Sequence, residues 1–135
     1  PYSVYSSWEL NTKKIKHQNH LGIKENLENA NLDTLDNIVR VYDIKNSVIK
    51  CDVDGNELYV FQSGIDYLQK FKPKIVMELA PYLYEEYGYK SSELFNFFKS
   101  LGYKFYEVSS HKEINFIQEF SDKISVGSSK NIFLI

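Results

Sequence analysis

The chain has 135 residues, of which 43% are hydrophobic and 25% charged, and its formal net charge is −2. These values predict one globular domain with a substantial core, and they exclude the strongly basic surface typical of proteins that bind nucleic acid or anionic membranes. The single cysteine excludes an intramolecular disulfide, and without an apolar run of bilayer length or a signal peptide we expect a cytoplasmic protein.

Residues 1–31 have the weakest periodicity, and we predict that they form an irregular N-terminal connection. Alternating side chains near the start give a weak strand signal, carried by Tyr2, Val4, Ser6 and Trp8. His17 and His20 lie three residues apart in a polar stretch that shows no helical period. Since no pattern of cysteines or carboxylates accompanies them, we predict solvated loop residues and no metal site.

Residues 31–39 predict the start of a helix, because Asp33 or Thr34 can cap its first turn. Its apolar side chains share one face, which is formed by Leu35, Ile38 and Val39. The next strong signal is the apolar run 48–53, a short strand that Gly55 brings to an end.

A helix is predicted from about residue 56, with Gly64 as a break or a close-packing point and Pro73 beyond its end. The apolar period predicts four buried side chains, Leu58, Phe61, Ile65 and Leu68. Residues 75–79 predict a second short strand. The tyrosine-rich segment 82–89 is predicted to be a loop that either walls a pocket for a flat or sugar-like ligand or covers an edge of the core.

Ser91 or Ser92 is predicted to cap the next helix, which Gly102 ends. This helix buries one apolar face, made of Leu94, Phe95, Phe98 and Leu101. The remaining predicted elements are a strand at 103–108, a helical turn at 115–120 and a strand at 131–135. Strands that alternate with helices predict an α/β fold with a mostly parallel sheet, in which the last strand is antiparallel.

Carboxylates gather where the first two predicted strands end. Asp52, Asp54 and Glu57 follow the first strand, and Glu78 closes the second. Ligands of open α/β sheets bind outside the carboxyl ends of the strands, so these groups could serve as a general base, a metal ligand or a hydrogen-bond acceptor. The alternative is that Asp54 and Glu57 only favour the positive end of the next helix.

Two other reactive side chains are predicted to be structural. Cys51 lies inside an apolar strand, so we expect a buried and inert thiol. His111 follows a strand in a polar turn, and we expect it at the surface.

Several motifs in register resemble the signature of the FkbM-type methyltransferases, "tLD … iKiDvEGaEl … G … P-x-ilvE … lGY". The matching residues are Thr34-Leu35-Asp36, Ile49 to Leu58, Gly64, Pro73 with Ile75 to Glu78, and Leu101-Gly102-Tyr103. The resemblance covers about residues 32–135. Asp54 stands where the family usually has Glu, and Asn56 stands where it usually has a small residue.

The resemblance implies an S-adenosylmethionine-dependent O-methyltransferase that acts on a hydroxyl of a sugar or secondary metabolite. Residues 32–135 would form the C-terminal half of a Rossmann-like sheet. By family position, Asp52, Glu57 and Glu78 would line the edge where acceptor and cofactor meet, and they are the predicted catalytic residues.

One departure from the family concerns the cofactor. The family holds it with a glycine-rich turn, and nothing in residues 1–31 resembles such a turn, so we expect this chain alone to bind S-adenosylmethionine poorly and to be inactive. The alternative function is a non-catalytic binding or interaction module derived from the same fold. The strand at 48–53 would be central in the complete sheet, so its bare edge predicts a homo-oligomer if the chain is autonomous.

Overall fold

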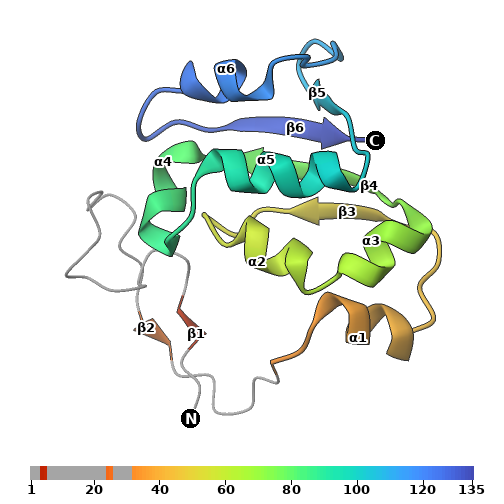
Figure 1. Ribbon diagram of the computed structural model, residues 1–135. Helices are drawn as coiled ribbons and strands as arrows, with labels where there is room; N and C mark the ends of the chain where they lie inside the picture. The colour runs from red at the N-terminus through yellow and green to blue at the C-terminus, as the bar shows by residue number, and fades with distance from the viewer. Residues whose placement is uncertain (1–3, 6–23, 26–31) are drawn as a thin grey trace. The chain divides into compact units, whose positions relative to one another are not determined.

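The computed structural model describes residues 4–5, 24–25 and 32–135 (Figure 1). Contacts divide the chain into two units, 1–33 and 34–135. In the first unit, strand β1 (Val4–Tyr5) pairs antiparallel with β2 (Lys24–Glu25). The rest of the predicted N-terminal connection, including His17 and His20, lies outside the described residues.

The second unit is built on a four-stranded sheet with the order β3-β4-β6-β5. Its strands are β3 (Val48–Cys51), β4 (Lys74–Leu79), β5 (Phe105–Glu107) and β6 (Lys130–Leu134). β3 is parallel to β4, whereas β6 is antiparallel to both β4 and β5. Three strands therefore share one direction and only the last runs against them, which confirms the predicted partial Rossmann-like α/β sheet.

The helices are α1 (Leu35–Val41), α2 (Glu57–Gln62), α3 (Ile65–Phe71), α4 (Pro81–Tyr84), α5 (Ser91–Ser100) and α6 (Ile117–Asp122), with a 3-10 helix, η2 (Glu85–Tyr87). Thr34 caps α1, since its hydroxyl accepts the backbone N–H of Asn37 at 3.1 Å. That cap confirms one of the two predicted for this helix. No helix among the described residues is long and apolar enough to cross a bilayer.

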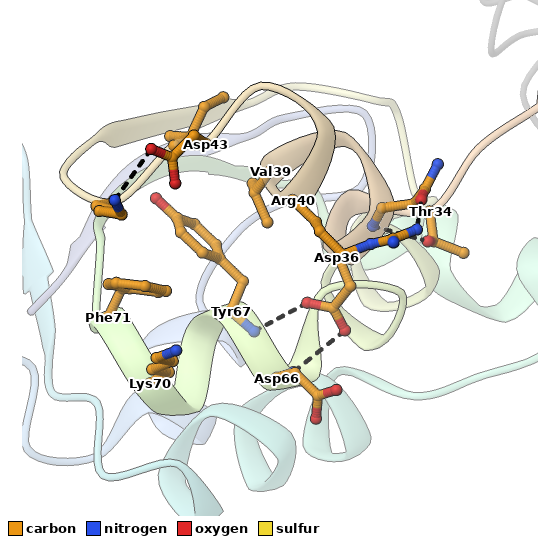
Figure 2. A pocket seen from close by; sticks show the side chains of 12 residues that line it. Thr34, Asp36, Val39, Arg40, Asp43, Asp66, Tyr67, Lys70 and Phe71 are labelled. Atoms are coloured by element: carbon orange, nitrogen blue, oxygen red, sulfur yellow. Dashed lines mark hydrogen bonds and ion pairs between the residues drawn. The ribbon is translucent and has the colours of Figure 1, made fainter.

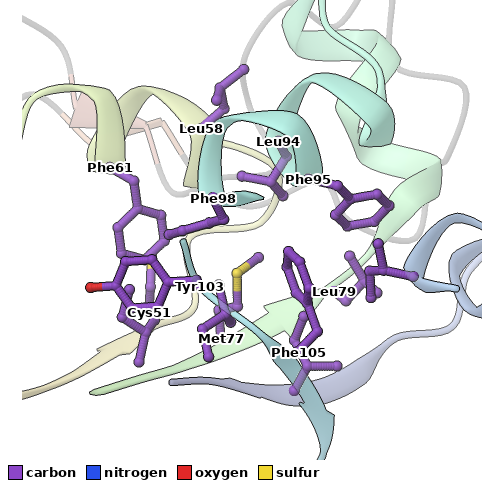
Figure 3. Close-up of a cluster of buried hydrophobic side chains, with 14 of the residues drawn as sticks. Cys51, Leu58, Phe61, Met77, Leu79, Leu94, Phe95, Phe98, Tyr103 and Phe105 are labelled. Carbon is purple, nitrogen blue, oxygen red and sulfur yellow. The ribbon is translucent and has the colours of Figure 1, made fainter. Parts of the chain in front are cut away.

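The core lies between one face of the sheet and helices α2 and α5 (Figure 3). Strand alternation selects that face, because Ile75, Met77 and Leu79 are buried while the intervening Val76 and Glu78 are partly exposed. The helices contribute large side chains to the same core, among them Leu58, Phe61, Leu94, Phe95 and Phe98. These five confirm the predicted apolar faces of the two helices.

Gly64 divides the predicted helix from residue 56 into α2 and α3. A Cβ atom on Gly64 would lie 2.5 Å from the Leu35 side chain, so the predicted break is also a close-packing point. The break changes the helical phase, and the prediction that Ile65 is buried is therefore wrong. Ile65 is 40% exposed, while Tyr67 is buried in its place.

Two predicted details near α4 and α5 are also wrong. Residues 82–89 are not a loop, because Pro81 starts a short helix that continues into η2. The cap of α5 is Lys90 rather than Ser91 or Ser92. The Glu93 carboxylate accepts the Lys90 backbone N–H at 2.9 Å, which moves the start of the helix by one residue.

Candidate functional site

The predicted carboxylates meet at the carboxyl edge of the two parallel strands. Asp52 directly follows β3, and Glu78 is the last but one residue of β4. Carboxylate oxygens of Asp52, Asp54 and Glu78 all lie within 4.8 Å of one another. The structure thus brings together two of the three predicted catalytic residues, Asp52 and Glu78, and adds Asp54 to them.

A tight turn after β3 creates this arrangement. Asp54 and Gly55 have φ angles of 46° and 104°, so two consecutive residues use the left-handed region. Gly55 is required there for a second reason, since a Cβ atom would lie 2.5 Å from the Tyr87 ring. We call residues 52–55 the acidic turn.

Glu57, the third predicted catalytic residue, lies elsewhere. Its side chain is fully buried, and its carboxylate accepts the backbone N–H groups of Val53 at 3.3 Å and Gly55 at 3.1 Å. It therefore binds the acidic turn from the interior of the protein rather than facing the open edge. Both N–H groups belong to the turn before α2, so these contacts do not cap the helix; Glu57 is also acidic in its first turn, and the alternative that it favours the positive end of α2 stays a prediction.

The electrostatics of the edge distinguish Asp52 from Glu78. Lys50 binds Asp52 at 2.8 Å, and this hydrogen bond is the main reason why the pKa of Asp52 is lowered. The pKa of Glu78 is raised, first by burial and then by the neighbouring Asp52 carboxylate, although the Ser129 hydroxyl donates to Glu78 and opposes the shift. Of these two carboxylates, Glu78 is the one that holds a proton more readily.

The spacing of the three carboxylates also bears on the prediction of no metal site. Oxygens so close together are compatible with a divalent cation, which prefers such ligands. The interaction between the Asp52 and Glu78 side chains, which lowers the pKa of Asp52 and raises that of Glu78, accounts for the same closeness without an ion. We therefore base no chemistry on a metal ion.

Burial also raises the pKa of Glu57 above its usual value of 4.5, because desolvation outweighs the backbone N–H groups bound to it. The folded chain then holds this proton more tightly than the unfolded chain does. The resulting stability is fully present below about pH 4.5 and is lost as the pH rises through the folded-state pKa. We expect the free energy of unfolding of the wild type, minus that of Glu57→Gln, to fall as the pH is raised through this window.

Urea unfolding of both proteins at a series of pH values measures this difference in the free energy of unfolding. The contributions of groups that titrate in the same way in both proteins cancel in the difference. Glu93→Gln makes the same substitution at an exposed carboxylate in the first turn of α5 and is the reference for the effect of the substitution itself. If the difference between the wild type and Glu57→Gln instead grows with pH, the backbone hydrogen bonds lower the pKa of Glu57 more than burial raises it.

Two tyrosines of segment 82–89 take the second of the two roles considered for them, covering the core edge. Tyr84 and Tyr89 are buried and stack with ring centroids 5.0 Å apart, so they cover the core edge. Tyr82 is only partly buried, and its pKa is raised by burial and by the nearby charges of Glu78 and Asp54. Sequence reasoning did not separate Tyr82 from the other rings.

The two side chains predicted to be structural are placed as expected. Cys51 is buried, which confirms that part of the prediction, and burial raises the pKa of its thiol to about 12, as expected of an inert cysteine. His111 is exposed in the turn that follows β5, and its ring centroid lies 6.3 Å from that of Phe133. It is a surface residue at the same edge of the sheet as the carboxylates.

A hollow that the sequence did not predict lies between α1 and α3 (Figure 2). Its volume is about 680 Å³, and it borders residues 43–45, just before β3 begins. Much of its polar wall already binds other protein groups. Asp36 accepts the backbone N–H groups of Asp66 and Tyr67, and Asp43 pairs with Lys45. We therefore place the chemistry at the opposite, carboxyl edge of the sheet.

Comparison with known proteins shows the family of the chain. The Methyltransferase FkbM domain matches residues 2–105, which include the acidic turn and Glu78 and make up well over half of the chain. Neither the curated proteins nor the solved structures contain a significant match. The chain therefore belongs to the FkbM methyltransferase family.

Proposed function

We propose that this protein is an S-adenosylmethionine-dependent O-methyltransferase whose acceptor is a hydroxyl group of a sugar or secondary metabolite. The observation that supports the proposal most is the carboxylate edge. In a chain of a methyltransferase family, Asp52 and Glu78 stand at the carboxyl ends of adjacent parallel strands, where α/β sheets bind ligands.

The raised pKa of Glu78 gives this residue a role in the reaction. A hydroxyl group becomes a stronger nucleophile when a base removes its proton during attack, and a base works best with a pKa close to the working pH. We assign proton acceptance to Glu78. Asp52 is held ionised by Lys50 and keeps a negative charge beside Glu78, which favours transfer of the proton to it.

We assign the acceptor side of such a site to the carboxylate edge, and the described residues include no glycine-rich cradle for the cofactor. S-adenosylmethionine would supply an electrophilic methyl group. Of the chain's six glycines, the five at described positions are spread over 55–127, and none forms a glycine-rich turn at the carboxyl edge. We therefore assign no cofactor-binding residues.

Methyl transfer by the intact gene product tests the proposal. With tritium-labelled S-adenosylmethionine and a panel of saccharides and polyhydroxylated compounds, we expect label in a product that resists mild base. Ethers survive this treatment, whereas methyl esters, the products of carboxyl methylation, are hydrolysed. Failure of the intact protein to bind S-adenosylmethionine in calorimetry would overturn the proposal.

The scattered glycines favour one other candidate, a non-catalytic binding module that kept the sheet and lost the cofactor site. The same calorimetry separates the two functions. A module of this kind would give no heat with S-adenosylmethionine, while a methyltransferase would bind it.

A further inference from the structure

We propose that Glu57 and Tyr89 are positioning residues that hold the acidic turn in the shape that sets Asp52 and Asp54 beside Glu78. The inference rests on the proposed function, because it assigns these residues a part in the same site. It also changes the role of Glu57, which the family position suggests as a catalytic residue.

The acidic turn needs external support. Two consecutive residues with positive φ, the first of them a non-glycine, store strain that persists only where the surroundings fix the backbone. Glu57 supplies part of that support from the buried side of the turn. Its two carboxylate oxygens accept the N–H groups of Val53 and Gly55, so one buried side chain holds both ends of the bend.

Tyr89 binds the backbone carbonyl group of Gly55, the residue whose N–H group Glu57 binds. Its hydroxyl donates to the Gly55 carbonyl oxygen at 2.7 Å, and its ring is 4% exposed. Gly55 thus has its N–H bound by Glu57 and its carbonyl bound by Tyr89. The Tyr87 ring packs against the position where a side chain would begin.

The same tyrosine pair also reaches the end of β4. Tyr89 stacks on Tyr84 at an interplanar angle of 20°, and the Tyr84 hydroxyl accepts the Ala80 backbone N–H at 3.3 Å. Ala80 lies two residues after Glu78. The stacked rings therefore connect the turn that carries Asp52 and Asp54 with the strand end that carries Glu78.

Burial distinguishes positioning from catalysis for these residues. Glu57 and Tyr84 have no exposed surface, and Tyr89 has almost none, so they cannot touch an acceptor at the open edge. Their effect on the reaction has to pass through the spacing of the Asp52, Asp54 and Glu78 carboxylates. A misplacement of about 1 Å can cost about 10²-fold in rate.

Tyr89→Phe tests the inference, because it removes only the hydroxyl group. The matched control is Tyr103→Phe, since Tyr103 is equally buried and its hydroxyl donates to the Pro73 carbonyl oxygen at 3.0 Å, just before β4 begins. We expect Tyr89→Phe to lower kcat by about 10-fold to 10²-fold, with KM for S-adenosylmethionine within about twofold. Tyr103→Phe should leave kcat unchanged. Equal effects of the two variants on kcat would overturn the inference.

Amide NMR spectra provide a readout that does not depend on methyl transfer. Tyr89→Phe and Glu57→Gln should both move the amide resonances of Asp52, Asp54 and Glu78, while Tyr103→Phe should not. Unmoved resonances in Glu57→Gln, together with lost activity, would show that Glu57 is itself catalytic. The kinetic measurements use the intact gene product. If its wild type transfers no methyl group, the proposed function fails, and the resonances still decide whether Glu57 and Tyr89 hold the turn. Should one variant fail to fold, the other gives the answer.

Discussion

Replacing Phe98 with alanine is expected to lower the free energy of unfolding by about 3–5 kcal/mol, the usual cost of deleting a buried aromatic ring. Phe98 has no exposed surface and lies at the centre of the core between α5 and the sheet (Figure 3). The centroid of its ring lies 4.8 Å from that of the Phe61 ring and 5.6 Å from that of the Tyr103 ring, and both pairs are nearly edge to face. The substitution removes these ring contacts and leaves a cavity, and urea unfolding measures the loss.

Phe116→Ala is the matched control, because this phenylalanine is 70% exposed. This substitution should change the free energy of unfolding by no more than about 0.5 kcal/mol, as most surface substitutions do. A domain of this size is typically stable by about 5–15 kcal/mol, so the Phe98 variant would lose a large part of its stability. A cost below about 1 kcal/mol for Phe98→Ala would contradict the described core.

The sequence was sufficient to predict the architecture, because the signals that specify it are local. Apolar runs at 48–53 and 75–79 are short enough to be strands, and their alternation with helical periods implies parallel neighbours. The buried thiol of Cys51 follows from its position inside such a run. The antiparallel direction of the last strand follows from the chain order, since two strands come last without a long helix between them.

Details that depend on contacts between distant residues could not be predicted. The phase of α3 depends on how Gly64 meets Leu35, and the capping of α5 depends on where the Glu93 side chain turns. A helical pattern reports which residues share a face, but it cannot say where a break resets that face. For this reason the sequence pattern predicts a buried Ile65, whereas the structure exposes it.

The candidate site shows the same limit. The spacing of residues predicted that Asp52 and Glu78 meet at one edge, because parallel strands end together. It could not show that the Glu57 carboxylate turns inward, since an acidic residue in the first turn of a helix suits either direction. Association through the edge of β3 stays a prediction, and within the described part of the chain β3 pairs only with β4.

Glu78→Gln is expected to lower kcat for methyl transfer by about 10²–10⁴-fold, the usual contribution of a general base. Glutamine keeps the size of the side chain and can still accept the Ser129 hydroxyl, but it cannot take up a proton from the acceptor. Affinity for S-adenosylmethionine should change little, because the substitution removes a step of the reaction rather than a contact to the cofactor. Initial rates with labelled S-adenosylmethionine, together with calorimetry, separate the two quantities.

Glu107→Gln is the matched control, since Glu107 ends β5 at the same edge of the sheet and binds Ser110 rather than the carboxylate cluster. It should leave kcat unchanged. Asp52→Asn then tests the cause of the raised pKa of Glu78, because it removes the neighbouring negative charge. If Glu78 acts as an ionised base, the rate rises with pH as Glu78 loses its proton, and Asp52→Asn moves that rise to lower pH. An unchanged pH profile in Asp52→Asn, or equal losses in Glu78→Gln and Glu107→Gln, would remove Glu78 from the reaction.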